Sequence, residues 1–184
     1  YKQTASKMFG IPIDQIDKPL RQRGKVSTLA LGYQGGTGAL IAMGALKMGV
    51  PEEDLPKLVK AWRKANPHIA RLWREVEDRV RTCVQNHTEV SLHHGISFKY
   101  DSGYLLIQLP SGRWLAYLQP RLTSEGKIQY QGMEQGKRIW GVKDTYGGKF
   151  TENIVQAIAR DCLAEAMLKV AAAGYEICFH IHDE

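Results

Sequence analysis

Apolar residues recur at a helical period in the first and last parts of the chain and alternate in the middle. The most regular helical stripe precedes a polar stretch near residue 86 and consists of Ile69, Leu72, Trp73, Val76, Val80, Cys83 and Val84. This spacing predicts one long helix after Pro67. A second long helix is predicted over residues 151–173, with Gly174 as its C-cap.

Weaker patterns predict the remaining elements. Helices are expected over residues 1–9, 19–33, 39–47 and from about residue 51 to the residue before Pro67. From residue 89 to about 148 the period shifts towards two, and strands are expected at 91–92, 96–98, 104–109 and 113–118. The apolar run 175–181 is expected to form a last strand. The pattern therefore predicts an α+β protein.

The same pattern divides the 184 residues into three regions: 1–87, which is helical, 88–149, which is rich in strands, and 150–184. With 43% hydrophobic and 24% charged residues, the composition is that of a globular protein. Charged residues interrupt every apolar run before about 18 residues, so no membrane partner is expected. Three cysteines without a Cys-x-x-Cys spacing argue against a disulfide framework and favour the cytoplasm.

The net positive charge of the chain bears on the kind of partner that it binds. Twenty-five Lys and Arg residues stand against 19 Asp and Glu residues, which gives a net charge of +6. A polyanion such as a nucleic acid is the natural partner for a basic surface. A basic surface that only contacts solvent is the alternative, and net charge alone does not decide between them.

One predicted helix carries an unusual stripe at a spacing of four residues. Its members are Arg21, Lys25, Leu29 and Tyr33. Residues four apart lie on one face of a helix, so two cations are followed by an apolar and an aromatic group. This order suits a nucleotide, with phosphates at one end and a flat heterocycle at the other. The alternative is that Arg21 and Lys25 are surface charges aligned by chance.

Residues 20–36, LRQRGKVSTLALGYQGG, resemble motif B of family A (DNA polymerase I-type) DNA polymerases. That motif has Arg, three residues, Lys, three residues, usually Phe or Tyr, three residues, and Tyr-Gly. Four more segments resemble this family in order and interval: 1–10, 61–73, 153–167 and the final His-Asp-Glu, which matches motif C. Ser111-Gly112-Arg113 is a weaker match. The length of the middle region is similar to that of a phage or prophage branch.

The resemblance implies template-directed DNA synthesis from deoxynucleoside triphosphates on a primer–template, with two Mg²⁺ ions. It also implies fingers helices in 1–87, a strand-rich insertion in 88–149, and part of an antiparallel palm in 150–184. The implied catalytic residues are Arg21, Lys25 and Asp183. Nucleotide binding is assigned to Tyr1, Arg21, Lys25, Leu29 and Tyr33; DNA binding to Arg113, Asn153, Gln156 and His182; and metal binding to Asp183 and, more weakly, Glu184.

Some positions depart from the family pattern. Leu29 stands where Phe or Tyr is usual, Gln34 follows Tyr33 where Gly is usual, and Tyr1 falls where His is common. Motif A, which supplies another metal-binding Asp, would lie before Tyr1. The chain is therefore interpreted as an excerpt, without the motif A part of the palm and without the thumb, and the excerpt alone is expected to be catalytically silent.

Two other functions stay open. The first is a non-catalytic nucleic-acid-binding module that keeps the basic surface without the chemistry. The second is a metal hydrolase, because His180 and His182 would share one strand face next to Asp183. Binding of a nucleoside triphosphate would separate polymerase from binding module, and metal-dependent cleavage of a simple ester would support the hydrolase.

Overall fold

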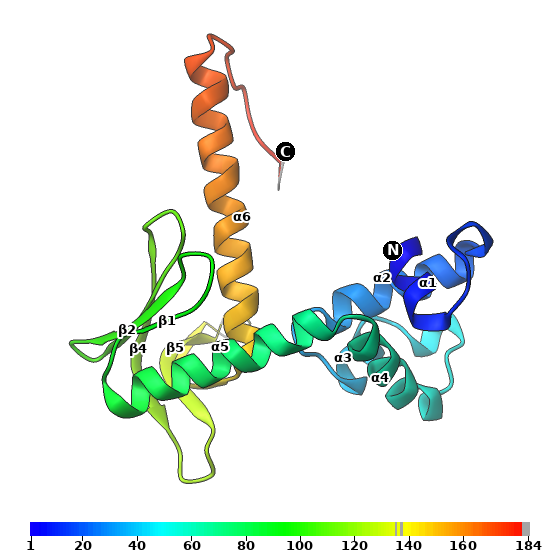
Figure 1. The fold of residues 1–184 in the computed structure, drawn as a ribbon, viewed down its shortest axis with the longest axis horizontal. Coiled ribbons are helices and arrows are strands. Elements are labelled where there is room, and N and C mark those ends of the chain that lie inside the picture. Colours follow the sequence, from blue (N-terminus) through cyan, green and yellow to red (C-terminus); the bar gives the residue numbers. More distant parts are fainter. Residues whose placement is uncertain (135, 137, 182–184) are drawn as a thin grey trace. The chain divides into compact units, whose positions relative to one another are not determined.

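The computed structural model describes residues 1–134, 136 and 138–181 and has the α+β composition expected from the sequence (Figure 1). Contacts divide the chain into two compact units, Tyr1–Glu75 and Val76–Glu184. The division falls inside a long helix rather than at its end. None of the helices in the described residues is long and apolar enough to cross a membrane.

Unit 1, residues 1–75, is helical. Its helices are α1 (Lys2–Phe9), α2 (Lys18–Leu31), α3 (Thr37–Ala42), α4 (Leu55–Ala65) and the first part of α5 (Pro67–Asn86), with 3₁₀ turns at Ile13–Gln15, Leu46–Met48 and Glu52–Asp54. The α2 helix begins where Asp17 accepts a hydrogen bond from the Leu20 N–H at 2.8 Å, with a proline in the first turn. Gly10, with φ of 68°, closes α1.

The core of unit 1 is built around two stacked tryptophans. The rings of Trp62 and Trp73 lie with centroids 5.8 Å apart and nearly parallel, and both side chains are buried. The Trp73 indole N–H donates to the carbonyl oxygen of Gly32 at 3.1 Å, which ties α5 to the end of α2. Both tryptophans therefore belong to the core of unit 1.

Unit 2, residues 76–184, contains a six-stranded antiparallel sheet in which every strand pairs with the next along the chain. The strands are β1 (Val90–Ser91), β2 (Ser97–Asp101), β3 (Tyr104–Gln108), β4 (Trp114–Leu122), β5 (Ile128–Glu134) and β6 (Ile139–Thr145). The four strands predicted from alternation are present. The alternation does not predict β5 and β6, because Met133, Trp140 and Val142 are exposed apolar residues that interrupt it.

The sheet packs against the start of α6 (Gly147–Ala172), which begins four residues earlier than predicted. Phe150 is 1% exposed, and its ring meets Tyr117 of β4 edge-to-face with centroids 5.0 Å apart. Ile154, one turn further along α6, is also buried. The helix ends at Ala172, and Gly174 then takes the left-handed conformation, with φ of 87°, two residues beyond.

The predicted strand at 175–181 is wrong. These residues have no regular secondary structure, and Tyr175, Phe179 and Ile181 are each more than 60% exposed. A β-strand needs a neighbouring strand to bond its backbone N–H and C=O groups. None of the strands in the described ranges pairs with this segment. An apolar run alone does not show whether a partner strand is present.

Candidate functional site

The α2 helix presents the predicted stripe to solvent. Arg21 is exposed, Lys25 is partly exposed and Leu29 is 49% exposed. The opposite face packs into unit 1 and consists of Gly24, Val26, Ser27, Ala30 and Leu31. The helix therefore has one packed face and one face on which two cations and an apolar side chain are available to a ligand.

Close packing of α1 on α2 brings Tyr1 to the stripe. A Cβ atom added at Gly24 would lie 2.6 Å from the Tyr1 carbonyl oxygen and 3.0 Å from the Ala5 Cβ, so only glycine allows this approach. The guanidinium carbon of Arg21 lies 5.8 Å from the centroid of the Tyr1 ring, within the range of a cation–π contact. Two residues assigned to the nucleotide, Tyr1 and Arg21, are thus neighbours.

The cations of the stripe are not neutralised locally. Within the described part of the chain, neither Arg21 nor Lys25 forms an ion pair with a carboxylate. The sequence of residues 1–75 has 13 Lys and Arg against six Asp and Glu, whereas residues 76–184 have 12 against 13. Unit 1 therefore carries a formal charge of +7 and unit 2 of −1, so the excess positive charge belongs to the unit that contains the stripe.

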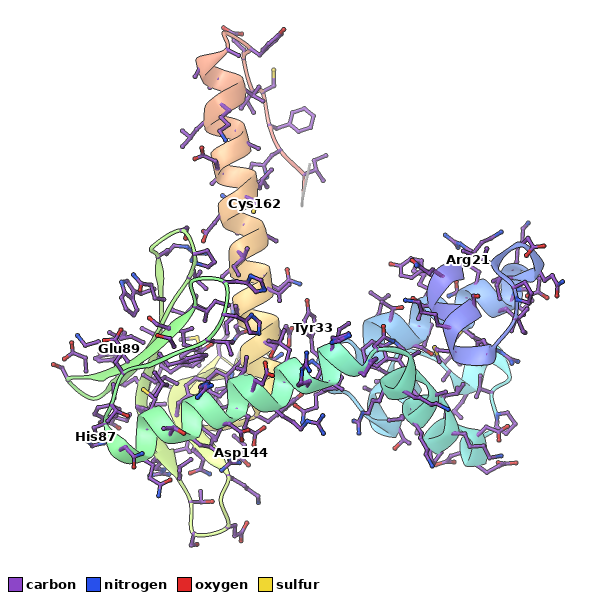
Figure 2. The ribbon with its side chains drawn as sticks, viewed as in Figure 1. Arg21, Tyr33, His87, Glu89, Asp144 and Cys162 are labelled. Carbon is purple, nitrogen blue, oxygen red and sulfur yellow. The ribbon has the colours of Figure 1, made fainter. Side chains whose placement is uncertain are left out.

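Tyr33 lies just beyond the end of α2, because the helix stops two residues earlier than predicted. The Gly32 N–H still bonds to the Thr28 carbonyl at 3.0 Å, and Gln34 then turns the chain with φ of 68°. A Cβ at Gly35 would lie 1.9 Å from the Ala30 carbonyl oxygen, which makes this close turn possible only with glycine. Figure 2 shows Arg21 and Tyr33 at opposite ends of α2.

Arg113, assigned to DNA from the sequence, is engaged by α6. Its Nε donates to Asp161 Oδ1 at 2.7 Å, and its Nη2 donates to the Ala157 carbonyl at 2.9 Å. The Ser111 hydroxyl donates to the other carboxylate oxygen of Asp161 at 2.6 Å. The Ser111 hydrogen bond and the Arg113 guanidinium lower the pKa of Asp161. Arg113 therefore joins the β3–β4 turn to α6.

Asn153 and Gln156, two more residues of unit 2 assigned to DNA, differ from each other. The Asn153 amide donates to the Tyr117 hydroxyl at 2.8 Å and is partly buried at the junction of α6 and the sheet. Burial raises the pKa of Tyr117 to about 12, and the Asn153 hydrogen bond acts in the opposite direction. Gln156 is exposed on α6. Of these two side chains, that of Gln156 is the one exposed to solvent.

His182, Asp183 and Glu184 lie outside the described residues, so the predicted motif C and metal positions stay predictions. His180, which belonged to the hydrolase alternative, is exposed in the irregular segment after α6. Across the residues with described positions, no cluster of three His, Cys, Asp or Glu side chains could hold a metal ion.

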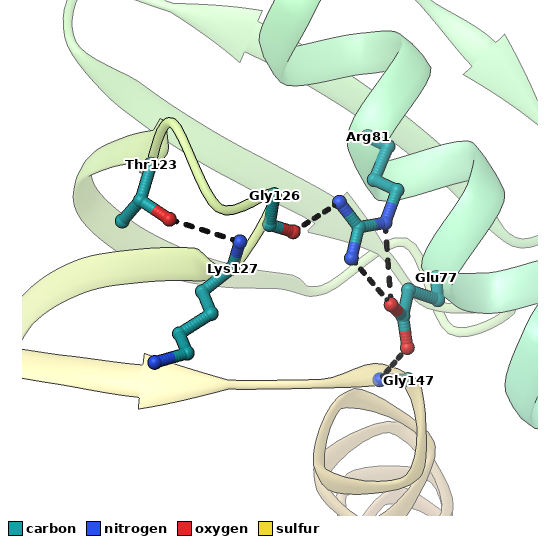
Figure 3. Close-up of polar contacts among 6 residues, drawn as sticks. All are labelled: Glu77, Arg81, Thr123, Gly126, Lys127 and Gly147. Carbon is teal, nitrogen blue, oxygen red and sulfur yellow. Dashed lines mark hydrogen bonds and ion pairs between the residues drawn. The ribbon is translucent and has the colours of Figure 1, made fainter.

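The sequence interpretation missed a polar junction at the start of α6 (Figure 3). One oxygen of Glu77 accepts the Gly147 N–H at 2.9 Å, and the other accepts two hydrogen bonds from Arg81. Arg81 also donates to the Gly126 carbonyl in the β4–β5 turn. Glu77 places negative charge at the positive end of α6. The Glu–Arg spacing of four residues is the signal that could have indicated half of this junction.

Comparison with known proteins shows a similarity to a DNA polymerase. That relative comes from Bacillus phage SP02, and it is 53% identical to this chain over an alignment that covers the whole chain. The chain spans 29% of the length of that polymerase. No protein-family model matches the chain.

Proposed function

We propose that this chain is the nucleotide-binding part of a phage-type, family A DNA polymerase, which extends a primer on a DNA template. The observation that carries the proposal is the exposed face of α2, where Arg21 and Lys25 have no carboxylate partner among the described residues and Tyr1 lies against Arg21. The similarity to the phage DNA polymerase supports it. The DNA substrate and the cysteine pattern fit the cytoplasm of a bacterial host.

The residues of the stripe have different roles along α2. Arg21 and Lys25 hold the triphosphate, because two uncompensated cations neutralise charge that develops on the phosphates during transfer. Lys25 also donates a proton to the leaving pyrophosphate. Leu29 packs on the sugar and base, and Tyr33 stacks at the template side, where such contacts contribute about 1–3 kcal/mol per base.

Asp183 is the metal carboxylate in this proposal, and Glu184 is a weaker candidate. Carboxylate oxygens are the ligands that Mg²⁺ prefers, so the donor chemistry of this pair fits the ion. Two bound Mg²⁺ ions would stabilise the attacking and leaving oxygens of the transfer. His182 and Gln156 are assigned to the primer end and the nascent pair.

The proposal is tested with Lys25→Ala in the polymerase that contains this chain. Removing one of two triphosphate cations should raise the KM for the incoming nucleotide and slow incorporation roughly 10-fold or more, since hydrogen bonds to charged groups contribute about 1.5–3 kcal/mol. Primer–template affinity should stay within about twofold. Lys47→Ala, an exposed lysine of the same unit, is the matched control and should change neither quantity.

The opposite pattern would reject the assignment. If Lys25→Ala weakened DNA binding and left the nucleotide kinetics untouched, the exposed face of α2 would contact the duplex instead. That result would favour the alternative of a non-catalytic nucleic-acid-binding module, which the +7 charge of unit 1 also suits.

A further inference from the structure

A pocket of about 470 Å³ lies in unit 1 between the start of α3 and the exposed side of α4. Its lining is formed by Gly36, Thr37, Pro56, Val59, Lys60 and Arg63. The volume falls in the range of pockets that hold one small ligand. None of these residues belongs to the stripe on α2, so this pocket is a separate feature of the surface.

The pocket combines an apolar wall with two cations. Pro56 and Val59 supply apolar surface, and Lys60 and Arg63 are exposed at the lining. The Arg63 Nη2 atom lies 3.3 Å from the Gly35 carbonyl, which leaves most of its donors open. Lys60 forms no ion pair within the residues whose positions are described.

The charge pattern of α4 favours an anionic ligand. The helix carries Lys57, Lys60, Arg63 and Lys64 and no Asp or Glu. Asp54, just before the helix, pairs with Lys57 at 2.7 Å and leaves the two cations of the pocket unopposed. An apolar wall beside two free cations suits a nucleotide unit, whose base is flat and whose phosphate is charged.

The position of the pocket along the chain indicates which part of a DNA strand it could bind. Gly36 follows Tyr33 by three residues, so the pocket begins within about 11 Å of the stripe's aromatic end. We propose that this pocket, defined here as the α3–α4 pocket, binds a phosphodiester-linked nucleotide of single-stranded DNA that continues past Tyr33. The inference rests on the proposed function, because that function supplies the strand. It adds a second contact that the stripe does not provide.

The test measures binding of a fluorescein-labelled oligothymidylate of about 12 nucleotides to the 184-residue chain by fluorescence anisotropy. The double variant Lys60→Gln and Arg63→Gln should lower the affinity roughly 10-fold near 50 mM salt. Two lost phosphate contacts should also reduce the slope of log affinity against log salt by about 1.4. The matched control, Lys7→Gln with Lys47→Gln, removes the same charge from exposed positions of unit 1 and should lower the affinity by less than about twofold.

A third variant tests the shape of the pocket without changing its charge. A Cβ at Gly36 would meet nothing within 4 Å, and its φ of −120° suits any residue. Gly36→Leu should therefore keep the fold and fill the pocket, with a several-fold loss of affinity and an unchanged salt slope. An unchanged affinity in Gly36→Leu would show that the strand does not enter the pocket.

Two further measurements assign the ligand. Binding of Mg²⁺-dTTP should be unchanged in the Lys60 and Arg63 double variant and weakened in Lys25→Ala. A loss of triphosphate binding in the double variant would overturn the proposal. So would an equal loss of affinity for a blunt duplex in the double variant, or an equal loss of oligonucleotide affinity in the charge control. Failure of the unmodified chain to bind the oligonucleotide would overturn it as well. If Lys25→Ala left triphosphate binding intact while the double variant still lost the strand, the proposed function would fail and the pocket would stand.

Discussion

Charged residues of the two units play two different roles. In unit 1 the cations of the α2 stripe and of the α3–α4 pocket have no carboxylate partners among the described residues. In unit 2, two ion pairs help to join elements of the fold. The Glu77–Arg81 pair of α5 binds the backbone at Gly147 and Gly126, and Arg113 binds Asp161 of α6. The cations of the stripe and of the pocket are thus available to a ligand, whereas these two ion pairs of unit 2 support structure. The comparison teaches that the position of an Arg in a family motif does not tell which of these two roles it plays.

The largest expected effect concerns Asp183, the residue of unit 2 assigned to catalysis. In the polymerase that we propose contains this chain, Asp183→Asn should lower incorporation by roughly 10³-fold or more, because the proposed metal ions would supply several kcal/mol of charge stabilisation in phosphoryl transfer. Folding and primer–template binding should persist. The measurement is primer extension under single-turnover conditions.

Glu176→Gln removes another carboxylate from the segment after α6 and serves as the matched control, with little expected effect. The isolated 184-residue chain should show no primer extension, since one Asp cannot hold two Mg²⁺ ions against their repulsion. Extension by the isolated chain that disappears in Asp183→Asn would show that no motif A is needed. Incorporation that survives Asp183→Asn in the polymerase would remove Asp183 from the site.

The second prediction concerns the scaffold role of unit 2. Phe150→Ala should destabilise unit 2 by about 3–5 kcal/mol, because the ring is 1% exposed and packs on Tyr117. Triphosphate binding by unit 1 should persist under conditions in which unit 2 is unfolded. Urea unfolding followed by circular dichroism, together with a nucleotide titration, provides the test.

Phe179→Ala is the control for that variant, since Phe179 is 75% exposed and its loss should change stability by less than about 0.5 kcal/mol. Equal destabilisation by both variants would show that the segment after α6 is covered in solution. Loss of triphosphate binding in step with unit 2 unfolding would show that the two units do not act separately.

The long elements could be predicted from sequence, and the pairings between distant residues could not. The α5 stripe and the part of α6 from Thr151 onward each present several apolar residues at helical spacing, which is a strong local signal. The segment 175–181 has the apolar character of a strand without a partner strand in the described structure. Whether a partner exists is a property of the fold, so no local pattern could decide it.

The candidate site shows the same limit. The spacing of Arg21, Lys25 and Leu29 was enough to predict one exposed face of α2, because helix geometry is local. The approach of Tyr1 depends on the missing side chain at Gly24, and the role of Arg113 depends on Asp161, 48 residues later. Contacts of that range arise from packing, and a single sequence does not reveal them.

The third prediction decides what Arg113 does. Arg113→Ala should lower the Tm by a few degrees through loss of its bonds to Asp161 and Ala157, and should leave DNA affinity within about twofold. Arg160→Ala, an exposed arginine of α6, removes the same charge and should leave the Tm unchanged. A large fall in DNA affinity with an unchanged Tm would return Arg113 to the DNA-binding residues.

The pH dependence of stability provides a second test of the Arg113–Asp161 ion pair. The Ser111 hydrogen bond and Arg113 lower the pKa of Asp161 below its ordinary 3.8, so their contribution is present above that pH and is lost as the pH falls below it. Asp161→Asn should therefore flatten the loss of Tm below about pH 4. An identical acid profile in the variant would mean that this ion pair does not form in solution.

The smallest expected effect belongs to Leu29, at the apolar part of the stripe. An aliphatic side chain offers the sugar no hydrogen-bonding group, so the proposed site should distinguish nucleotides with and without a 3′-hydroxyl. Leu29→Tyr places a phenolic hydroxyl there, on a side chain that is already 49% exposed and can lengthen without a clash in the core. The hydroxyl should raise acceptance of dideoxynucleotides by up to about 10-fold, the equivalent of one hydrogen bond of about 0.5–1.5 kcal/mol.

Leu29→Phe adds the ring without the hydroxyl and is the matched control. If the hydroxyl acts on the sugar, termination ratios in primer extension should rise in the Tyr variant and stay near the starting value in the Phe variant. An equal rise in both would assign the effect to ring packing on the base. An unchanged ratio in both would place Leu29 away from the sugar. The triphosphate would then extend in another direction from the cationic end of α2, where Tyr1 lies beside Arg21.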